Sequence, residues 1–185
     1  MKSLVSKRLY ALGAALGMAA ALLPHSANAT TQTGSFNVTS SVAKNCSVSA
    51  TTLAYGAYDP VVANLASVLN GSNTMSVKCT KGTGSAVYVQ ANTGSNGAHA
   101  SGSCAVATCT RAMTDGTDYL SYDLYTDSGY THVWSPSATS GNTVFSFDFS
   151  TSGATQTATV YGQVPAAQNV EIGSYTDSIT MTVNF

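Results

Sequence analysis

Apolar and polar residues alternate with a period of two along much of this chain, and this pattern constrains its fold more than any other feature. In residues 178–185 the even positions hold Ser, Thr, Thr and Asn, and the odd positions hold Ile, Met, Val and Phe. Because successive side chains of a β-strand point to opposite faces, each such run predicts a strand with one buried and one solvated face. The same alternation recurs in residues 35–42, 74–80, 87–91, 120–124 and 145–149.

Turn-forming residues separate these runs, as in Asn70-Gly71, Asp115-Gly116 and Ser128-Gly129. Only 8% of the residues are charged, against about 25% in an average soluble protein, so little is available for helices with a charged face. Residues 63–69 look weakly helical, but the stretch is too short to predict a helix. Short strands between regular turns predict an all-β domain, either an antiparallel sandwich or a barrel.

The first 29 residues have the features of a secretory signal peptide. Cations at Lys2, Lys7 and Arg8 precede an apolar stretch over residues 9–23, and residues 27–29 (Ala-Asn-Ala) suit signal peptidase. The apolar stretch is shorter than the ~20 residues that a membrane-spanning helix needs. We therefore predict cleavage after residue 29, export to the periplasm and then the cell exterior, and no membrane insertion of the mature chain.

The charge balance excludes one class of function. The 185 residues contain seven Lys or Arg and eight Asp or Glu, and removal of the leader leaves four basic residues and a net charge of −4. Proteins that bind nucleic acid through its phosphates need clustered basic residues, so no nucleic-acid partner is predicted. With 44% hydrophobic residues and this modest net charge, the chain is also not predicted to be disordered.

Four cysteines lie in the exported part: Cys46, Cys79, Cys104 and Cys109. An even number in an oxidising compartment favours two disulfides, and four cysteines allow three pairings. Cys104 and Cys109 are close in a loop of small residues, so we predict that they pair locally and that Cys46 joins Cys79. The sequence has no C-x-x-C or H-x-x-x-H element, so the spacing does not indicate a zinc site.

Several motifs, in this order, resemble the spore coat protein U domain, the pilin module of archaic (Csu-type) chaperone–usher pili. The resemblance covers essentially the whole mature chain, while the Cys104/Cys109 loop is an addition to the core pattern. The motifs are GSFNVT (34–39), CSV (46–48), YGAYDP (55–60), SVKCT (76–80), YLSYDLY (119–125), TVYGQVPAAQ (159–168) and GSYTDSITMTVNF (173–185).

The resemblance implies an incomplete immunoglobulin-like antiparallel β-sandwich that lacks one strand and is completed by donor-strand complementation. The implied partners are a periplasmic chaperone, an outer-membrane usher and other pilin subunits. The donor would be residues 30–42, with Phe36, Val38 and Val42 entering the partner's core, and residues 43–185 would form the pilin domain. Periodicity alone leaves open whether a terminal strand closes its own sheet or adds to a neighbour.

This resemblance implies a structural subunit of a secreted surface pilus, or of a related coat fibre, that serves attachment and biofilm formation. A mature length of one domain argues against the family's two-domain tip adhesin. Whether the chain forms the bulk of a rod or a minor part is left open.

No motif indicates an enzyme, a cofactor or a metal. The mature chain has two histidines, His99 and His132, and neither accompanies a G-x-S-x-G motif. The acids of residues 115–127 are expected at turns or on the solvated face of a strand, and no D-x-D-x-D-G calcium loop is present. These acids are Asp115, Asp118, Asp123 and Asp127.

The alternative function is that of a secreted carbohydrate-binding β-sandwich module. Aromatic rings on an exposed sheet face can stack against sugars. Tyr122 shares the parity of the apolar residues around it and is expected in the core, whereas Tyr119 and Tyr125 have the opposite parity. The aromatic residues in question are Tyr119, Tyr122, Tyr125, Tyr130 and Trp134.

Overall fold

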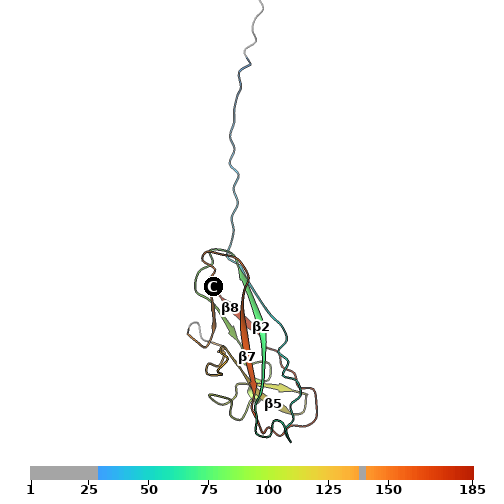
Figure 1. Ribbon diagram of the computed structural model, residues 1–185. Coiled ribbons are helices and arrows are strands. Elements are labelled where there is room, and N and C mark those ends of the chain that lie inside the picture. Colours follow the sequence, from blue (N-terminus) through green and yellow to red (C-terminus); the bar gives the residue numbers. More distant parts are fainter. Residues whose placement is uncertain (1–28, 138–140) are drawn as a thin grey trace, which may run out of the picture. The chain divides into compact units, whose positions relative to one another are not determined.

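The computed structural model describes residues 29–137 and 141–185 (Figure 1). The chain divides into two compact units, residues 1–40 and residues 41–185. In the first unit, the described residues 29–40 form neither helix nor strand and are exposed. The predicted signal peptide lies outside the described residues apart from Ala29.

The second unit consists of two antiparallel β-sheets. Strand order is β1-β2-β7-β5-β4 in the larger sheet and β6-β3-β8 in the smaller one, and every pairing is antiparallel. The long strands β2 and β7 run side by side (Figure 1). The elements are β1 (Cys46–Ala50), β2 (Leu69–Cys79), β3 (Val87–Ala91), the 3-10 helix η1 (Gly97–His99), β4 (Arg111–Thr114), β5 (Tyr119–Tyr125), β6 (Phe145–Phe147), β7 (Gln156–Val164) and β8 (Met181–Asn184).

The predicted all-β fold, an antiparallel sandwich of the immunoglobulin-like class, is confirmed. Within the described ranges no α-helix occurs, and no helix is long and apolar enough to cross a membrane. Two predicted strands differ from the structure. Residues 35–42 form no strand, and the strand predicted over residues 178–185 is limited to β8, because in both places part of the run has no neighbouring strand to pair with.

Alternate residues of the strands form one core between the sheets, as their parity predicts. Met75 and Val77 of β2 and Val89 of β3 are completely buried. Trp134 packs edge-on against Phe145 at a centroid distance of 5.0 Å, and its indole N–H donates to the carbonyl of Val89 over 2.8 Å. The core is therefore well packed around β3, β6 and Trp134.

Both disulfides form with the predicted pairing. Cys46 lies directly opposite Cys79 in the β1–β2 register, so this bond fastens the edge strand β1 to β2. The Cys104–Cys109 bond closes a short loop before β4. This loop covers the outer face of β5: the backbone N–H of Ala105 donates to the Tyr125 hydroxyl over 3.2 Å.

Because of that cover, both faces of β5 are buried, and the prediction of a solvated position for Asp123 is wrong. Asp123 and Tyr125 are both 0% exposed. The Asp123 carboxylate accepts hydrogen bonds from the Thr110 hydroxyl (2.5 Å) and the Thr110 backbone N–H (3.2 Å). Burial raises the pKa of Asp123 above its ordinary value, while the bonds from Thr110 and the nearby Arg111 oppose that rise.

Arg111, the first residue of β4, is fully buried and uses all five guanidinium N–H groups. Nε donates to the Asn92 carbonyl (3.0 Å), and Nη2 donates to the carbonyls of Ala91 (3.1 Å) and Trp134 (2.7 Å). Nη1 donates to Asp123 Oδ1 (3.1 Å) and to a neighbouring threonine hydroxyl. One cation thus ties β4 and β5 of the larger sheet to the end of β3 in the smaller one.

Replacing Arg111 should destabilise the domain far more than replacing an exposed cation. In Arg111→Met the Asp123 carboxylate stays buried without its partner, and breaking a buried pair in this way costs about 3–5 kcal/mol. The control Lys81→Met, at an exposed position, should change the free energy of unfolding by less than about 0.5 kcal/mol. Urea denaturation followed by the fluorescence of the single tryptophan measures both. Similar small losses in the two variants would contradict the assigned role of the Arg111 pair.

Candidate functional site

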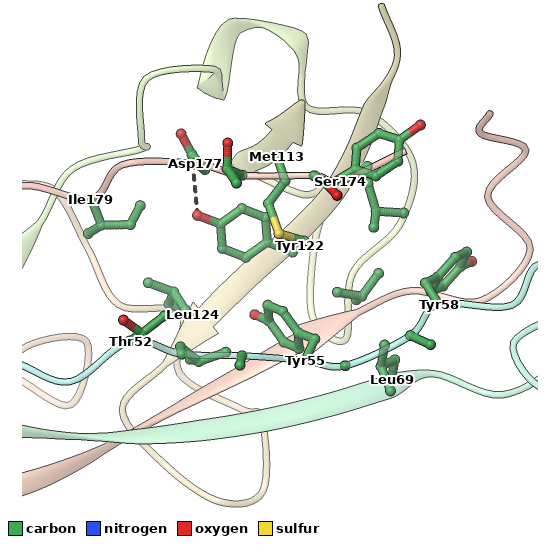
Figure 2. Close-up of a pocket in the computed structure, with 18 of the residues that line it drawn as sticks. Thr52, Tyr55, Tyr58, Leu69, Met113, Tyr122, Leu124, Ser174, Asp177 and Ile179 are labelled. Carbon is green, nitrogen blue, oxygen red and sulfur yellow. Dashed lines mark hydrogen bonds between the residues drawn. The ribbon is translucent and has the colours of Figure 1, made fainter. Parts of the chain in front are cut away.

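An open groove of about 1130 Å³ lies between the two sheets. One side of the groove is residues 50–60, which we call the first wall, and the other is residues 170–181, the second wall. Figure 2 shows Thr52, Tyr55 and Tyr58 of the first wall facing residues of the second wall across the open space. The floor is apolar and includes Leu69, Met113, Leu120, Leu124, Val160 and Val164.

The backbone of both walls is largely unpaired. Within the described part of the chain, residues 52–58 and residues 172–175 form no backbone hydrogen bond. The second wall is held at only a few points, such as the pairing of Thr176 with Thr114 and the bond from Asn92 N–H to the Thr180 carbonyl (3.0 Å). β1 and β8, which adjoin the walls, are edge strands of their sheets. The groove therefore offers two free edges above an apolar floor, which is the geometry that binds an added strand.

A pair of glycines shapes the floor under the first wall. Gly71 and Gly162 lie opposite each other in the β2–β7 register, and the side chains of Leu53 and Tyr55 rest on them. A Cβ at Gly71 would lie 3.0 Å from both Leu53 Cδ2 and Tyr55 Cδ1, and one at Gly162 would overlap the Tyr55 hydroxyl. Glycine at both positions thus lets the first wall lie close to the sheet, which leaves the rest of the groove open.

Polar groups hold the second wall in place. Asp177 Oδ2 accepts a hydrogen bond from the Tyr122 hydroxyl over 2.8 Å (Figure 2). Asp177 Oδ1 accepts from Ser95 N–H (2.9 Å) and from the amide of Asn96 (3.2 Å). Burial, followed by the neighbouring Asp177 carboxylate, raises the pKa of Tyr122 far above its ordinary value, so the hydroxyl remains a donor. No sequence pattern indicates that Asp177 anchors the second wall, because its partners are distant in sequence.

The Tyr55 hydroxyl is a buried polar group without a hydrogen-bond partner among the described residues. The ring meets Tyr122 edge-on at a centroid distance of 6.0 Å, and burial raises the pKa of Tyr55 strongly. A buried hydroxyl that forms no hydrogen bond destabilises the fold relative to an apolar group of the same shape. Tyr55 is therefore an unsatisfied polar side chain of the groove, and Asn73, whose Oδ1 also has no partner among the described residues, is another.

The apolar residues assigned to the donor segment are exposed. Phe36 is 87% exposed and Val38 is 83% exposed in the first unit, and Val42 is 83% exposed at the start of the second. Their placement does not test the assignment, and the donor role stays a prediction.

The other residues weighed in the sequence have local roles. His99 stacks on Tyr119 with centroids 4.0 Å apart, and His132 Nδ1 lies 3.3 Å from Asp127 Oδ1. Asp115 Oδ1 accepts the N–H groups of its own turn, as expected of an acid at a turn. In the described ranges, no group of three or more His, Cys, Asp or Glu residues is arranged to hold a metal ion.

The aromatic residues do not form a common exposed face. Tyr122 lies in the core, as its parity predicts, and Tyr125 and Trp134 are also buried. Tyr130 meets Tyr125 edge-on at 5.4 Å. Tyr119 is 37% exposed. These aromatic residues therefore do not form a platform on which a sugar could stack.

Comparison with known proteins places the chain in a family. The model of the Spore Coat Protein U domain matches residues 32–182. The chain belongs to the Spore Coat Protein U domain family. It is 35% identical over 180 residues to Protein U of Myxococcus xanthus, covering 93% of this chain and 96% of that protein. The resemblance inferred from the sequence motifs is thereby confirmed.

A solved structure also shows similarity. It is the CsuC–CsuE chaperone–tip adhesion subunit pre-assembly complex from archaic chaperone–usher Csu pili of Acinetobacter baumannii, with 20% identity and a TM-score of 0.46. The match covers 78% of this chain and 40% of the length of that chain.

Two conservative substitutions in the groove of this family member should have opposite effects on stability. Tyr55→Phe removes a hydroxyl without a partner, so the free energy of unfolding should stay the same or rise by up to about 1–3 kcal/mol. Tyr122→Phe removes the bond to the Asp177 carboxylate and should lower the free energy of unfolding by about 1.5–3 kcal/mol, the range for a hydrogen bond to a charged group. Urea denaturation of both variants checks this, and a larger loss for Tyr55→Phe than for Tyr122→Phe would refute the assignment of the unsatisfied group.

Proposed function

We propose that the chain is a secreted structural subunit of a surface pilus or coat fibre that polymerises by donor-strand exchange and serves attachment and biofilm formation. In this proposal residues 1–29 are the leader, residues 30–42 are the donor segment, and residues 43–185 are the domain that accepts a strand. A periplasmic chaperone fills the groove first, and at an outer-membrane usher the donor segment of the next subunit replaces it. The role is structural and involves no catalysis.

The observation that carries the proposal is the groove with two unpaired walls over an apolar floor. An extended segment placed between the walls would form backbone hydrogen bonds to residues 52–58 and 172–175, whose backbone groups have no such partner within the described chain. Its inward side chains would lie over the apolar floor, where Leu69 and Met113 are only partly buried. Each buried Val or Phe side chain contributes roughly 1.5–3 kcal/mol, so such a segment binds tightly.

Residues 30–42 have the chemistry that the groove needs. Phe36, Val38 and Val42 share one parity, while the opposite positions 35, 37, 39 and 41 hold Ser, Asn, Thr and Ser. An extended segment of this length spans roughly 40 Å, and the nine residues 50–58 of the first wall span roughly 30 Å, so the donor is long enough to fill the groove.

Introducing a charge on the apolar side of the donor segment should block polymerisation. In cells that produce the chain with its chaperone and usher, Phe36→Asp should remove the ladder of detergent-resistant multimers from unheated gel samples. The matched control Asn37→Asp places the same charge on the polar side of the segment and should leave the ladder intact. A normal ladder in Phe36→Asp would disprove the donor register, and a wild-type sample with monomer alone would disprove polymerisation itself.

Deleting residues 30–42 separates this function from that of a carbohydrate-binding module. The deletion should abolish multimers while the chaperone-bound domain remains soluble, because the domain keeps its own core. Binding to a glycan array measures the alternative. Glycan affinity that is present in the full chain and retained after the deletion would favour the carbohydrate-binding module.

A further inference from the structure

The groove has a direction, because its two walls run antiparallel to each other. In Figure 2 the order Thr52, Tyr55, Tyr58 along the first wall faces the order Ile179, Asp177, Ser174 along the second. The groove therefore begins beside β1 and β8 and ends beside residues 58–60 and 170–172. These two ends of the domain differ in charge.

The end that carries the Cys46–Cys79 disulfide is basic. Lys44 precedes β1, Lys78 belongs to β2, and Lys81 follows β2, and all three are exposed. Asp148, whose carbonyl accepts a bond from Gln156 at the start of β7, also lies toward this end and offsets one of the three positive charges. We call this surface the basic end.

The opposite end is acidic. Glu171 N–H donates to Asp118 Oδ2 over 2.8 Å, Asp118 N–H donates to Asp115 Oδ1 over 2.9 Å, and Asp59 lines the same end of the groove as Glu171. Backbone N–H groups hold the pKa values of Asp59 and Asp115 below their ordinary range, so both stay charged at neutral pH. We call the surface of Asp59, Asp115, Asp118 and Glu171 the acidic end.

The charges of these two ends are not paired within the domain. The ion pairs of the described residues are Arg111–Asp123 and His132–Asp127, and neither includes a lysine or Glu171. The eleven residues of β2 run from one end to the other, a length of roughly 33 Å. A lysine of the basic end therefore cannot reach the acidic end of its own domain.

Exposed apolar side chains surround the acidic end. Val61 and Val62 are 75% and 76% exposed beside Asp59, and Ile172 is fully exposed beside Glu171. The apolar methylenes of a lysine can cover such residues while its amine reaches a carboxylate. The acidic end thus offers both charge and apolar contact to a lysine-rich surface.

Only a short segment separates the donor residues from the basic end. The Thr80 hydroxyl donates to the Ala43 carbonyl over 3.3 Å, and Thr80 N–H donates to the Asn45 carbonyl over 2.9 Å. The chain is therefore attached to its domain from Ala43 onward, immediately after Val42. If Val42 of one copy lies in the groove of another, the basic end of the first copy must lie within a few ångströms of that groove's end.

The direction in which the donor segment enters the groove decides which end of the accepting copy lies next to the basic end of the donor copy. Because the two walls run antiparallel to each other, a strand between them is antiparallel to one wall and parallel to the other. The charges of the two ends distinguish these directions, and they favour a strand that is antiparallel to the second wall and β8. Its carboxyl end then lies at the acidic end. Insertion in the reverse direction would place the lysines of one copy against those of the next, where like charges repel.

We propose that the acidic end of each copy is a docking surface for the basic end of the next copy, so that successive domains are joined by ion pairs in addition to the inserted strand. This inference rests on the proposed function. The partner of the docking surface is a second copy of this chain. Lys44, Lys78 and Lys81 of that copy would contact Glu171 and the neighbouring aspartates. Val61, Val62 and Ile172 would lie beneath the lysine methylenes.

Zero-length cross-linking of isolated fibres tests the contact. A water-soluble carbodiimide joins a lysine amine to a carboxylate only where the two touch, and mass spectrometry identifies the linked peptides. We expect peptides that join Lys44, Lys78 or Lys81 to Glu171 or Asp118. Glu171→Gln should reduce their yield severalfold, whereas the control Asp148→Asn, an exposed acid toward the basic end, should not. Fibres that show the detergent-resistant ladder but lack these peptides would refute the docking surface and would remain consistent with donor-strand exchange.

Charge reversal gives an independent test. Glu171→Lys and Lys81→Glu should each lower the fibre yield severalfold, and the double variant should recover it, because the opposite charges then face each other again. A double variant no better than either single one would overturn the proposal. Loss of the ladder in the wild-type chain would instead refute the proposed function, and the docking surface with it.

Discussion

The two free backbone edges that face each other across the apolar groove are the constraint on which the rest of this structure depends. A sandwich of two sheets normally closes by pairing or covering its edges. In this domain, contacts on each side hold the two walls apart. The Cys46–Cys79 bond fastens the strand that leads into the first wall, and Asp177 anchors the second wall through Tyr122 and Ser95. The groove is thus a built feature, held open by links on each side.

Other buried contacts join the two sheets and cover β5. Arg111 satisfies all its donors between the sheets, and the Cys104–Cys109 loop covers the outer face of β5. Buried ion pairs add little net stability compared with apolar groups, but they penalise any arrangement that separates them. Since Arg111 bonds to both sheets, it fixes their relative position next to the groove, whose lining includes Met113 and Trp134.

Features that depend on residues close together in the sequence could be predicted from it, and features that depend on distant residues could not. Period-two alternation is local, so it identified the buried faces of β2, β3 and β6, and the close spacing of Cys104 and Cys109 identified their bond. Two roles depend on contacts between distant segments. Asp123 has the parity of a solvated residue but is covered by a loop, and Arg111 gains its partners from β3 and Trp134. No periodicity signals such contacts, and the donor register of Phe36 is likewise not determined by parity alone.

The distribution of charge bears on the kind of assembly that the domain can form. The proposed donor segment and the groove are two different surfaces of one molecule, so their contact would be heterologous, and repeated heterologous contacts produce open chains unless the rotation closes a ring. The proposed docking of the basic end on the acidic end would be a second heterologous contact along the same direction. Because Lys44 adjoins the proposed donor segment and Glu171 adjoins the groove's end, both contacts would select the same neighbour in the same orientation. Two copies that met symmetrically, basic end to basic end, would satisfy neither contact, so the charges favour a fibre over a closed dimer.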